Sequence, residues 1–123
     1  MSTEPAEPPY PRRGEIWRVN FDPTRGKEIR KIRPAVVLSS DGIGRLPIKV
    51  VAPVTEWKDR FGGNLWHIRI EPDTGNGLDK VSAVDVLQVR GVDTLRFVER
   101  LGRVSETTLE EIVSALTLVV EYQ

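Results

Sequence analysis

The sequence contains no cysteine and only one histidine, His67. The missing cysteines exclude disulfide bonds, thiolate metal sites and cysteine nucleophiles. A single histidine excludes a two-histidine ribonuclease mechanism within one chain and most zinc sites, and a lone histidine on a strand is more often structural or on the surface. Walker-type glycine loops and the serine-elbow motif are also absent. The remaining chemistry uses arginine, carboxylate and hydroxyl groups, without a metal ion or another cofactor.

The sequence also lacks long apolar runs. None approaches the roughly 20 residues of a membrane span, and the N-terminus has no apolar signal core. We therefore expect a soluble, cytoplasmic protein that does not bind a membrane. The length of 123 residues suits one domain. Residues 1–11 hold four prolines and almost nothing to bury, which predicts a disordered, proline-rich tail followed by a single domain over 12–123.

The formal net charge is zero, but the charges are unevenly distributed along the chain. Residues 12–60 carry 12 Lys and Arg against 6 Asp and Glu, whereas residues 61–123 carry 6 against 10. Such asymmetry can provide one face for a polyanion on a neutral molecule. The alternative is that folding intersperses the charges over the surface.

Short strands dominate the predicted secondary structure. Alternating or continuous apolar residues predict strands at 15–21, 34–40, 48–54, 65–70, 81–90 and 101–104. Pro53 suggests a sheet edge or strand end, and the period of two places Ser82, Gln88 and Arg90 on one face. Ser105 resembles an N-cap, and apolar residues at helical spacing follow it. Several short strands and one C-terminal helix predict a small antiparallel β-barrel.

A basic stretch over residues 26–33 leads directly into an apolar strand. Its four cations surround one carboxylate, Glu28. Pro34 favours an extended backbone at Arg33, so we expect this arginine at the mouth of a strand. A positioned guanidinium beside a carboxylate suits phosphodiester binding and cleavage, because it can bond two phosphate oxygens at once. The simpler interpretation is an ordinary charged hairpin loop.

Five motifs in order resemble the MazF/PemK family of toxin endoribonucleases. They are Arg13-Gly14-Glu15-Ile16-Trp17 with Asp22-Pro23 and Gly26-x-Glu28; Arg33-Pro34-Ala35-Val36-Val37-Leu38-Ser39; Val51-Ala52-Pro53-Val54-Thr55; Ser82, Gln88, Arg90 and Asp93 at the family's spacing; and Leu101-Gly102 before the helix. The resemblance covers about residues 12–122.

The resemblance implies a mainly β fold with a C-terminal helix, an SH3-like and CcdB-like antiparallel barrel, and a homodimer. It also implies metal-independent cleavage of single-stranded RNA, in which the 2′-hydroxyl attacks phosphorus and leaves a 2′,3′-cyclic phosphate and a 5′-hydroxyl. Arg33 matches the arginine to which the family assigns stabilisation of the phosphorane, with protonation of the leaving group as a second role; a guanidinium is a poor general acid, which favours stabilisation. Thr55 matches a threonine that binds phosphate. Glu28 matches a residue thought to act as the base in some members; a salt bridge to Arg30 or Lys31 is the alternative.

The residues expected to contact RNA lie on the basic loop and around the candidate site. They are Arg25, Lys27, Arg30, Lys31, Trp57, Ser82 and Gln88. The loop departs from the commoner family pattern Gly-Ser-Glu-Gln-x-Gly, and its added cations should strengthen phosphate contacts. An exposed Trp57 would stack on a splayed base; packing on Trp66 is the alternative.

Two other functions fit the same resemblance. CcdB, which shares the fold, poisons DNA gyrase and cuts nothing, but such a protein would not need Arg33, Glu28 and Thr55 together. A catalytically weak member acting as a regulator is the second alternative. The family also implies a cognate antitoxin with an acidic, disordered C-terminal arm. We expect this arm to compete with RNA for Arg33, Lys27 and Arg30; inhibition at a distance, through distortion of the dimer, is the alternative.

Overall fold

The computed structural model describes residues 10–43 and 47–122. They form seven strands and one α-helix, in the order β1 (Glu15–Asn20), β2 (Ile32–Val37), β3 (Ile48–Glu56), β4 (His67–Ile70), β5 (Ser82–Asp85), β6 (Arg90–Asp93), β7 (Phe97–Arg103) and α1 (Glu106–Val119). Short 3-10 turns lie at Asp41–Ile43, Asp59–Phe61, Val86–Gln88 and Thr94–Arg96. The predicted fold class, mainly β with one C-terminal helix, is confirmed.

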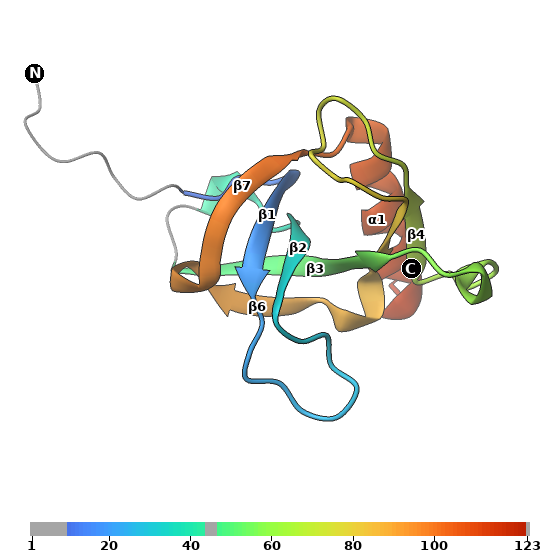
Figure 1. The fold of residues 1–123 in the computed structure, drawn as a ribbon, viewed down its shortest axis with the longest axis horizontal. Helices are drawn as coiled ribbons and strands as arrows, with labels where there is room; N and C mark the ends of the chain where they lie inside the picture. The colour runs from blue at the N-terminus through green and yellow to red at the C-terminus, as the bar shows by residue number, and fades with distance from the viewer. Residues whose placement is uncertain (1–9, 44–46, 123) are drawn as a thin grey trace, which may run out of the picture.

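The strands form one strongly bent antiparallel sheet. Its order is β4-β5-β3-β2-β1-β7, and β6 pairs with β3 outside this path (Figure 1). No pairing among the described strands joins β6 to β7, so the sheet is barrel-like without being closed. The loop between β1 and β2, which carries the basic stretch, extends away from the sheet (Figure 1).

Strand β3 is the element on which the sheet turns. Its first half pairs with β6 over Ile48–Val51, and its last residues pair with β5 over Val54–Glu56. Pro53 lies between these two pairings, where its missing N–H is tolerated. The prediction of an edge strand at Pro53 is therefore wrong, because a change of partner serves the same purpose inside the sheet.

The predicted continuous strand over 81–90 is also wrong. The chain leaves β5 after Asp85, makes a 3-10 turn and resumes as β6. The Asp85 carboxylate accepts a hydrogen bond from Leu87 N at 3.1 Å, which caps this turn. Ser82 and Gln88 consequently lie on different segments instead of on one face of one strand.

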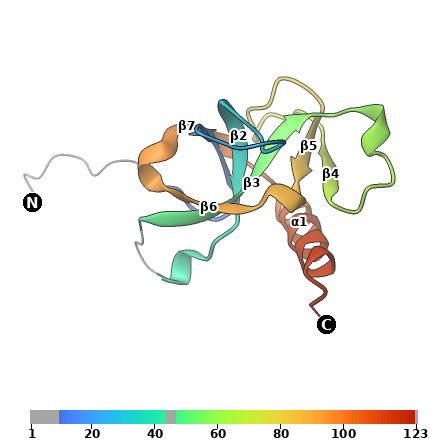
Figure 2. The same ribbon diagram turned by 90° about the horizontal axis from the view of Figure 1, so that it is seen from below.

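The bent sheet has a core on each side. One cluster includes Ile16 and joins the sheet to α1 through Leu109, Ile112 and Ala115; α1 packs at one end of the sheet near β4 and β5 (Figure 2). The other is built around Trp17, Val19, Phe21, Ala35, Val37, Val51 and Val92. Because β1 contributes to both clusters, Ile16 on one face of this strand is as deeply buried as Trp17 and Val19 on the other.

The predicted N-cap of α1 is present in the structure. Ser105 accepts a hydrogen bond from Thr108 N at 3.1 Å, which confirms it as the N-cap of α1.

Residues 1–9 of the predicted tail lie outside the described residues. Tyr10 and Pro11 were assigned to that tail, but Pro11 is buried and the Tyr10 ring lies 4.2 Å from Lys49 Nζ. None of the described helices is long and apolar enough to cross a membrane.

Candidate active site

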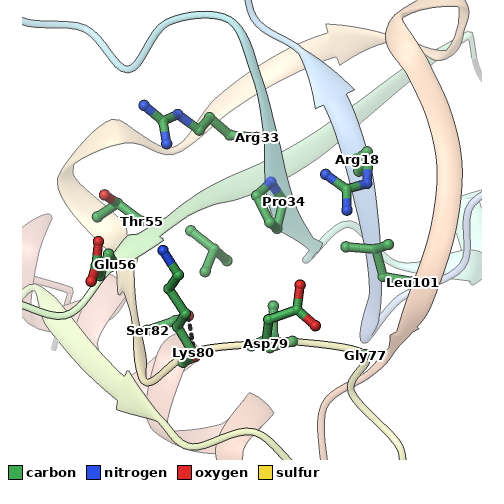
Figure 3. A pocket seen from close by; sticks show the side chains of 12 residues that line it. Arg18, Arg33, Pro34, Thr55, Glu56, Gly77, Asp79, Lys80, Ser82 and Leu101 are labelled. Atoms are coloured by element: carbon green, nitrogen blue, oxygen red, sulfur yellow. Dashed lines mark hydrogen bonds between the residues drawn. The ribbon is translucent and has the colours of Figure 1, made fainter.

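A hollow of about 190 Å³ brings Arg33 and Thr55 together, although 21 positions separate them in the sequence. We call it the Arg33 hollow, and Figure 3 shows its side chains. It is lined by Arg18, Arg33, Pro34, Val54, Thr55, Glu56, Gly77, Leu78, Asp79, Lys80, Ser82 and Leu101. Arg33 comes from the start of β2 and is exposed, as Pro34 predicted, and Thr55 comes from the end of β3.

Some polar side chains of the Arg33 hollow are already paired. Arg18 Nε lies 2.7 Å from Glu99 Oε1, and Lys58 Nζ lies 3.8 Å from Glu56 Oε2. Among the described residues, the side chains of Arg33 and Thr55 make no hydrogen bond or ion pair. A guanidinium and a hydroxyl without protein partners are available to the oxygens of a bound phosphate.

Glu28 lies elsewhere. It lines a second hollow, the Glu28 hollow, together with Phe21, Lys27, Ile29, Pro53, Leu87, Gln88, Val89 and Arg90. Its Oε1 accepts a hydrogen bond from Arg25 N, so the carboxylate closes a turn of its own loop. The predicted grouping of Glu28 with Arg33 and Thr55 in one site is not seen, because the loop carries Glu28 to this separate hollow.

Gln88 holds the same loop from the other side. Its Oε1 accepts from Ile29 N at 2.8 Å, and its Nε2 donates to Lys27 O at 3.2 Å. The base of the loop is closed by Asp22, whose Oδ1 accepts from Lys31 N at 3.0 Å, and Lys31 adopts a left-handed backbone with φ of 65°. Gln88 therefore acts on the loop backbone, a role that its sequence position did not reveal.

The predicted RNA-binding cations are all exposed on the loop. Arg25, Lys27, Arg30 and Lys31 are exposed, and Arg30 Nη2 donates to Gly26 O at 3.2 Å. The predicted alternative of a salt bridge from Glu28 to Arg30 or Lys31 does not occur among the described contacts. Ser82 is buried at the floor of the Arg33 hollow, where its hydroxyl donates to Lys80 O at 2.8 Å.

Trp57 belongs to an aromatic cluster beyond the end of β3. Its half-buried ring meets the edge of Phe61 at a centroid distance of 5.7 Å, and the Arg69 guanidinium lies 5.4 Å from its centroid. Phe61 in turn stacks on His67 at 3.8 Å. Trp57 thus packs against Phe61 instead of Trp66, the partner considered from the sequence.

His67 is a structural residue. Its side chain is buried, its Nδ1 lies 3.1 Å from Asn64 Nδ2, and its Nε2 lies 3.6 Å from Asp85 Oδ2. Burial raises the pKa of Asp85 above its ordinary value, and the nearby His67 and the backbone N–H groups of Leu87 and Gln88 offset this only in part.

Glu15 is a buried acid with the opposite behaviour. Burial alone would raise its pKa, but hydrogen bonds from Arg12 N, the Trp17 indole and Arg100 outweigh this effect and hold the pKa below its ordinary value. The three donors lie at 2.8, 3.0 and 2.7 Å. Glu15 ties β1 to β7, so its role is in stability and not in the site.

Four charged residues of the Arg33 hollow were missed from the sequence: Arg18, Glu56, Asp79 and Lys80. Arg18 stands opposite Pro34 in the register of β1 and β2. Asp79 and Lys80 lie between the strands predicted at 65–70 and 81–90, outside every predicted element and motif. No local signal marked them, because what brings them to the hollow is the pairing of β5 with β3.

Comparisons with known proteins identify the family of this chain. The family described as PemK-like, MazF-like toxin of type II toxin-antitoxin system matches residues 12–120. The chain is similar to Endoribonuclease MazF9 of Mycobacterium tuberculosis, with 36% identity over 118 residues that cover 87% of this chain and 93% of the relative. Because the relatives are named endoribonucleases, the predicted enzyme class, an endoribonuclease, is confirmed.

Solved structures share the fold. The crystal structure of MazF (Form-I) from Deinococcus radiodurans has a TM-score of 0.75 and 25% identity, covering 93% of this chain and 99% of that one. An endoribonuclease from Mycobacterial species, solved in complex with its cognate antitoxin, has a TM-score of 0.73 and 17% identity and covers 92% and 97%. The resemblance found in the sequence is confirmed, and the chain belongs to the PemK-like, MazF-like toxins of type II toxin–antitoxin systems.

Proposed function

We propose that this chain is an endoribonuclease that cleaves single-stranded RNA through attack of the ribose 2′-hydroxyl on the adjacent phosphorus. The products are a 2′,3′-cyclic phosphate and a 5′-hydroxyl, and the reaction needs no metal ion. The observation that carries this proposal is the Arg33 hollow, where a guanidinium and a hydroxyl line one cavity without partners among the described residues. Family membership supports the same activity.

Arg33 and Thr55 have complementary roles in this reaction. The pentacoordinate phosphorane carries more negative charge on its oxygens than the starting phosphodiester. A fixed cation beside those oxygens therefore stabilises the transition state more than the ground state. Arg33 supplies this cation, and Thr55 donates a hydrogen bond to a non-bridging oxygen. A guanidinium holds its proton too tightly to act as an efficient acid, so its contribution is electrostatic.

The basic loop binds the RNA backbone in this proposal. Arg25, Lys27, Arg30 and Lys31 contact phosphates, which gives affinity that weakens as salt is raised. Ser82 lines the floor beneath the scissile phosphate. Gln88 contributes by holding the loop, and Glu28 by closing its turn. Trp57 offers an aromatic surface on which a base stacks.

The same reasoning extends to the assembly and its control. We propose a homodimer in the cytoplasm, neutralised by a cognate antitoxin whose acidic C-terminal arm competes with RNA for Arg33 and the loop cations. Membership in a type II toxin–antitoxin family supports an antitoxin. The exposed cations favour an acidic partner, whose binding should weaken with salt.

The test is to incubate the purified protein with a long single-stranded RNA in the presence of EDTA. We expect discrete cuts, mapped by primer extension, and 5′ ends that a kinase labels directly because they carry hydroxyls. An Arg33→Ala protein serves as the control for contaminating ribonucleases. Intact RNA combined with inhibition of gyrase supercoiling would contradict the proposal and favour a CcdB-like poison.

A further inference from the structure

Two consecutive charged residues, Asp79 and Lys80, line the Arg33 hollow although none of the recognised motifs includes them. Figure 3 shows the Lys80 side chain directed toward Thr55, and the Asp79 carboxylate on the side of Pro34 and Arg18. Neither side chain makes a hydrogen bond or ion pair with another described residue. Among the described residues, the hollow thus contains a free ammonium group on the side of Thr55 and a free acidic group on the side of Pro34 and Arg18 (Figure 3).

The backbone that carries this pair is firmly held. Asn76 is buried; its Oδ1 accepts from Leu78 N at 3.0 Å, and its Nδ2 donates to Glu71 O at 2.9 Å. Gly77 has φ of 69° and packs so closely on β7 that a Cβ atom would lie 2.2 Å from Leu101 O. Lys80 O accepts the Ser82 hydroxyl. These contacts on both sides fix where the Asp79 and Lys80 side chains start.

The proposed reaction needs a proton acceptor and a proton donor that Arg33 and Thr55 do not provide. The 2′-hydroxyl must lose a proton, and the departing 5′-oxygen must gain one. Glu28 lies in the other hollow and caps its loop, and His67 is buried beneath Phe61. Glu56 lines the Arg33 hollow but lies 3.8 Å from the ammonium of Lys58. An ammonium group releases a proton more readily than a guanidinium, which favours Lys80 over Arg33 as the donor.

We propose that Asp79 and Lys80 are the acid–base pair of this active site, a role that rests on the proposed function. The Asp79 carboxylate accepts the 2′-hydroxyl proton while the bond from O2′ to phosphorus forms. The bond from phosphorus to O5′ then breaks, and Lys80 gives its proton to O5′. Asp79 is left protonated and Lys80 neutral, and transfer of one proton from Asp79 to Lys80 restores both groups.

The test of Lys80 uses an RNA oligonucleotide spanning one mapped cut and a second oligonucleotide in which sulfur replaces the scissile O5′. A thiolate leaves without protonation, so loss of a general acid harms only the oxygen substrate. We expect Lys80→Met to lower kcat at least about 100-fold on the oxygen substrate and less than about 10-fold on the sulfur substrate. Lys58→Met removes a lysine that does not line the hollow and should cut both substrates normally.

Lys80→Arg separates charge from acidity. It keeps a cation for RNA binding, so KM should stay near the wild-type value while kcat on the oxygen substrate remains low. Lys80 is exposed, and thermal unfolding will show whether each variant folds. Equal losses on both substrates for Lys80→Met would reject the acid role, because a binding or electrostatic role does not depend on the leaving group.

Asp79 is tested by Asp79→Asn, which preserves size and removes the base. We expect a loss of at least about 100-fold on both substrates and disappearance of the acidic limb in the pH profile of kcat/KM. Near wild-type rates with an unchanged profile would reject Asp79 as the base. Wild-type protein that cuts neither substrate would overturn the proposed function, and the acid–base pair with it. Variants that fail these tests while the wild-type protein cuts RNA would overturn the acid–base pair alone.

Discussion

The Arg33 hollow and the Glu28 hollow use polar side chains in opposite ways. In the first, Arg33 and Thr55 come from strands and have no protein partners among the described residues. In the second, the side chains of Glu28 and Gln88 form hydrogen bonds with the backbone of the β1–β2 loop. The first hollow has the free groups that chemistry requires, whereas the second builds a loop that presents cations.

This difference shows why a residue type alone does not assign a role. Glu28 and Asp79 are both exposed carboxylates, yet Glu28 accepts a backbone hydrogen bond, whereas Asp79 has no partner within residues 10–43 and 47–122. Substitutions in the Arg33 hollow should therefore affect the rate of the chemical step. Those in the Glu28 hollow should affect RNA affinity and loop order.

The largest effect is expected from Arg33→Ala. Removal of the cation beside the phosphorane should lower kcat/KM at least about 100-fold, the scale of a lost oxyanion stabiliser. The thermal midpoint should hardly change, because the Arg33 side chain is exposed and pairs with no residue in the described part of the chain. Arg103→Ala, which removes an exposed arginine outside both hollows, is the matched control. A folded Arg33→Ala protein with normal turnover would contradict the assignment.

Thr55→Val should have the next largest effect. Valine keeps the shape of the side chain and removes the hydroxyl, so a hydrogen bond to a charged oxygen worth about 1.5–3 kcal/mol is lost, a factor of about 10 to 100 in rate. Single-turnover cleavage of a saturating RNA substrate measures it. Thr55→Ser retains the hydroxyl and should recover most of the rate. Equal activity of the valine and serine variants would show that the hydroxyl takes no part.

Glu28→Gln distinguishes the two hollows directly. Glutamine keeps an oxygen that can accept from Arg25 N, so the loop turn should survive and cleavage should fall less than about 10-fold. A general base at this position would instead account for about 100-fold or more. The pH profile of kcat/KM should keep its acidic limb in this variant. Its disappearance would return the base to Glu28 and unite the two hollows in function.

Gln88→Ala should have a smaller effect, confined to binding. Two hydrogen bonds to the loop are lost, each worth about 0.5–1.5 kcal/mol. The dissociation constant for RNA should therefore rise several-fold while kcat at saturation stays the same. Faster hydrogen exchange at Ile29 N would confirm the loosened loop. Gln88→Glu keeps the acceptor for Ile29 N, so its dissociation constant for RNA should lie between those of the wild-type protein and Gln88→Ala. A large loss of kcat in Gln88→Ala would instead indicate that Gln88 takes part in the chemical step.

The smallest effect on activity at neutral pH is expected from Glu15→Gln, because Glu15 lies outside both hollows. Because the folded-state pKa of Glu15 is lowered, its ionised form stabilises the fold fully above the unfolded-state pKa of about 4.3, and this stability is lost as pH falls through the folded value. The wild-type protein should thus be more stable than the variant at pH 7, with the gap narrowing below about pH 4. Urea unfolding at both pH values measures this. A gap that stays constant would show that the carboxylate charge is not what stabilises the fold.

The sequence by itself determined the elements whose signals are local. Pro34 fixed the extended approach of Arg33 to β2, and the Ser105 cap with apolar residues at helical spacing fixed the start of α1. The motifs also determined the family, because they require only order and spacing along the chain. The motifs also assigned Arg33 and Thr55 to one candidate site, and both residues line the Arg33 hollow.

Tertiary structure decided everything that depends on which segments meet. The break in the predicted strand after Asp85 could not be seen in the sequence, because apolar residues continue through it. The turn is explained by the change of partner along β3, which pairs first with β6 and then with β5. Gln88 supports the loop because the 3-10 turn over Val86–Gln88 passes beside residues 27–29. Asp79 and Lys80 reached the Arg33 hollow because β5 pairs with the end of β3, a contact between distant segments that no local pattern encodes.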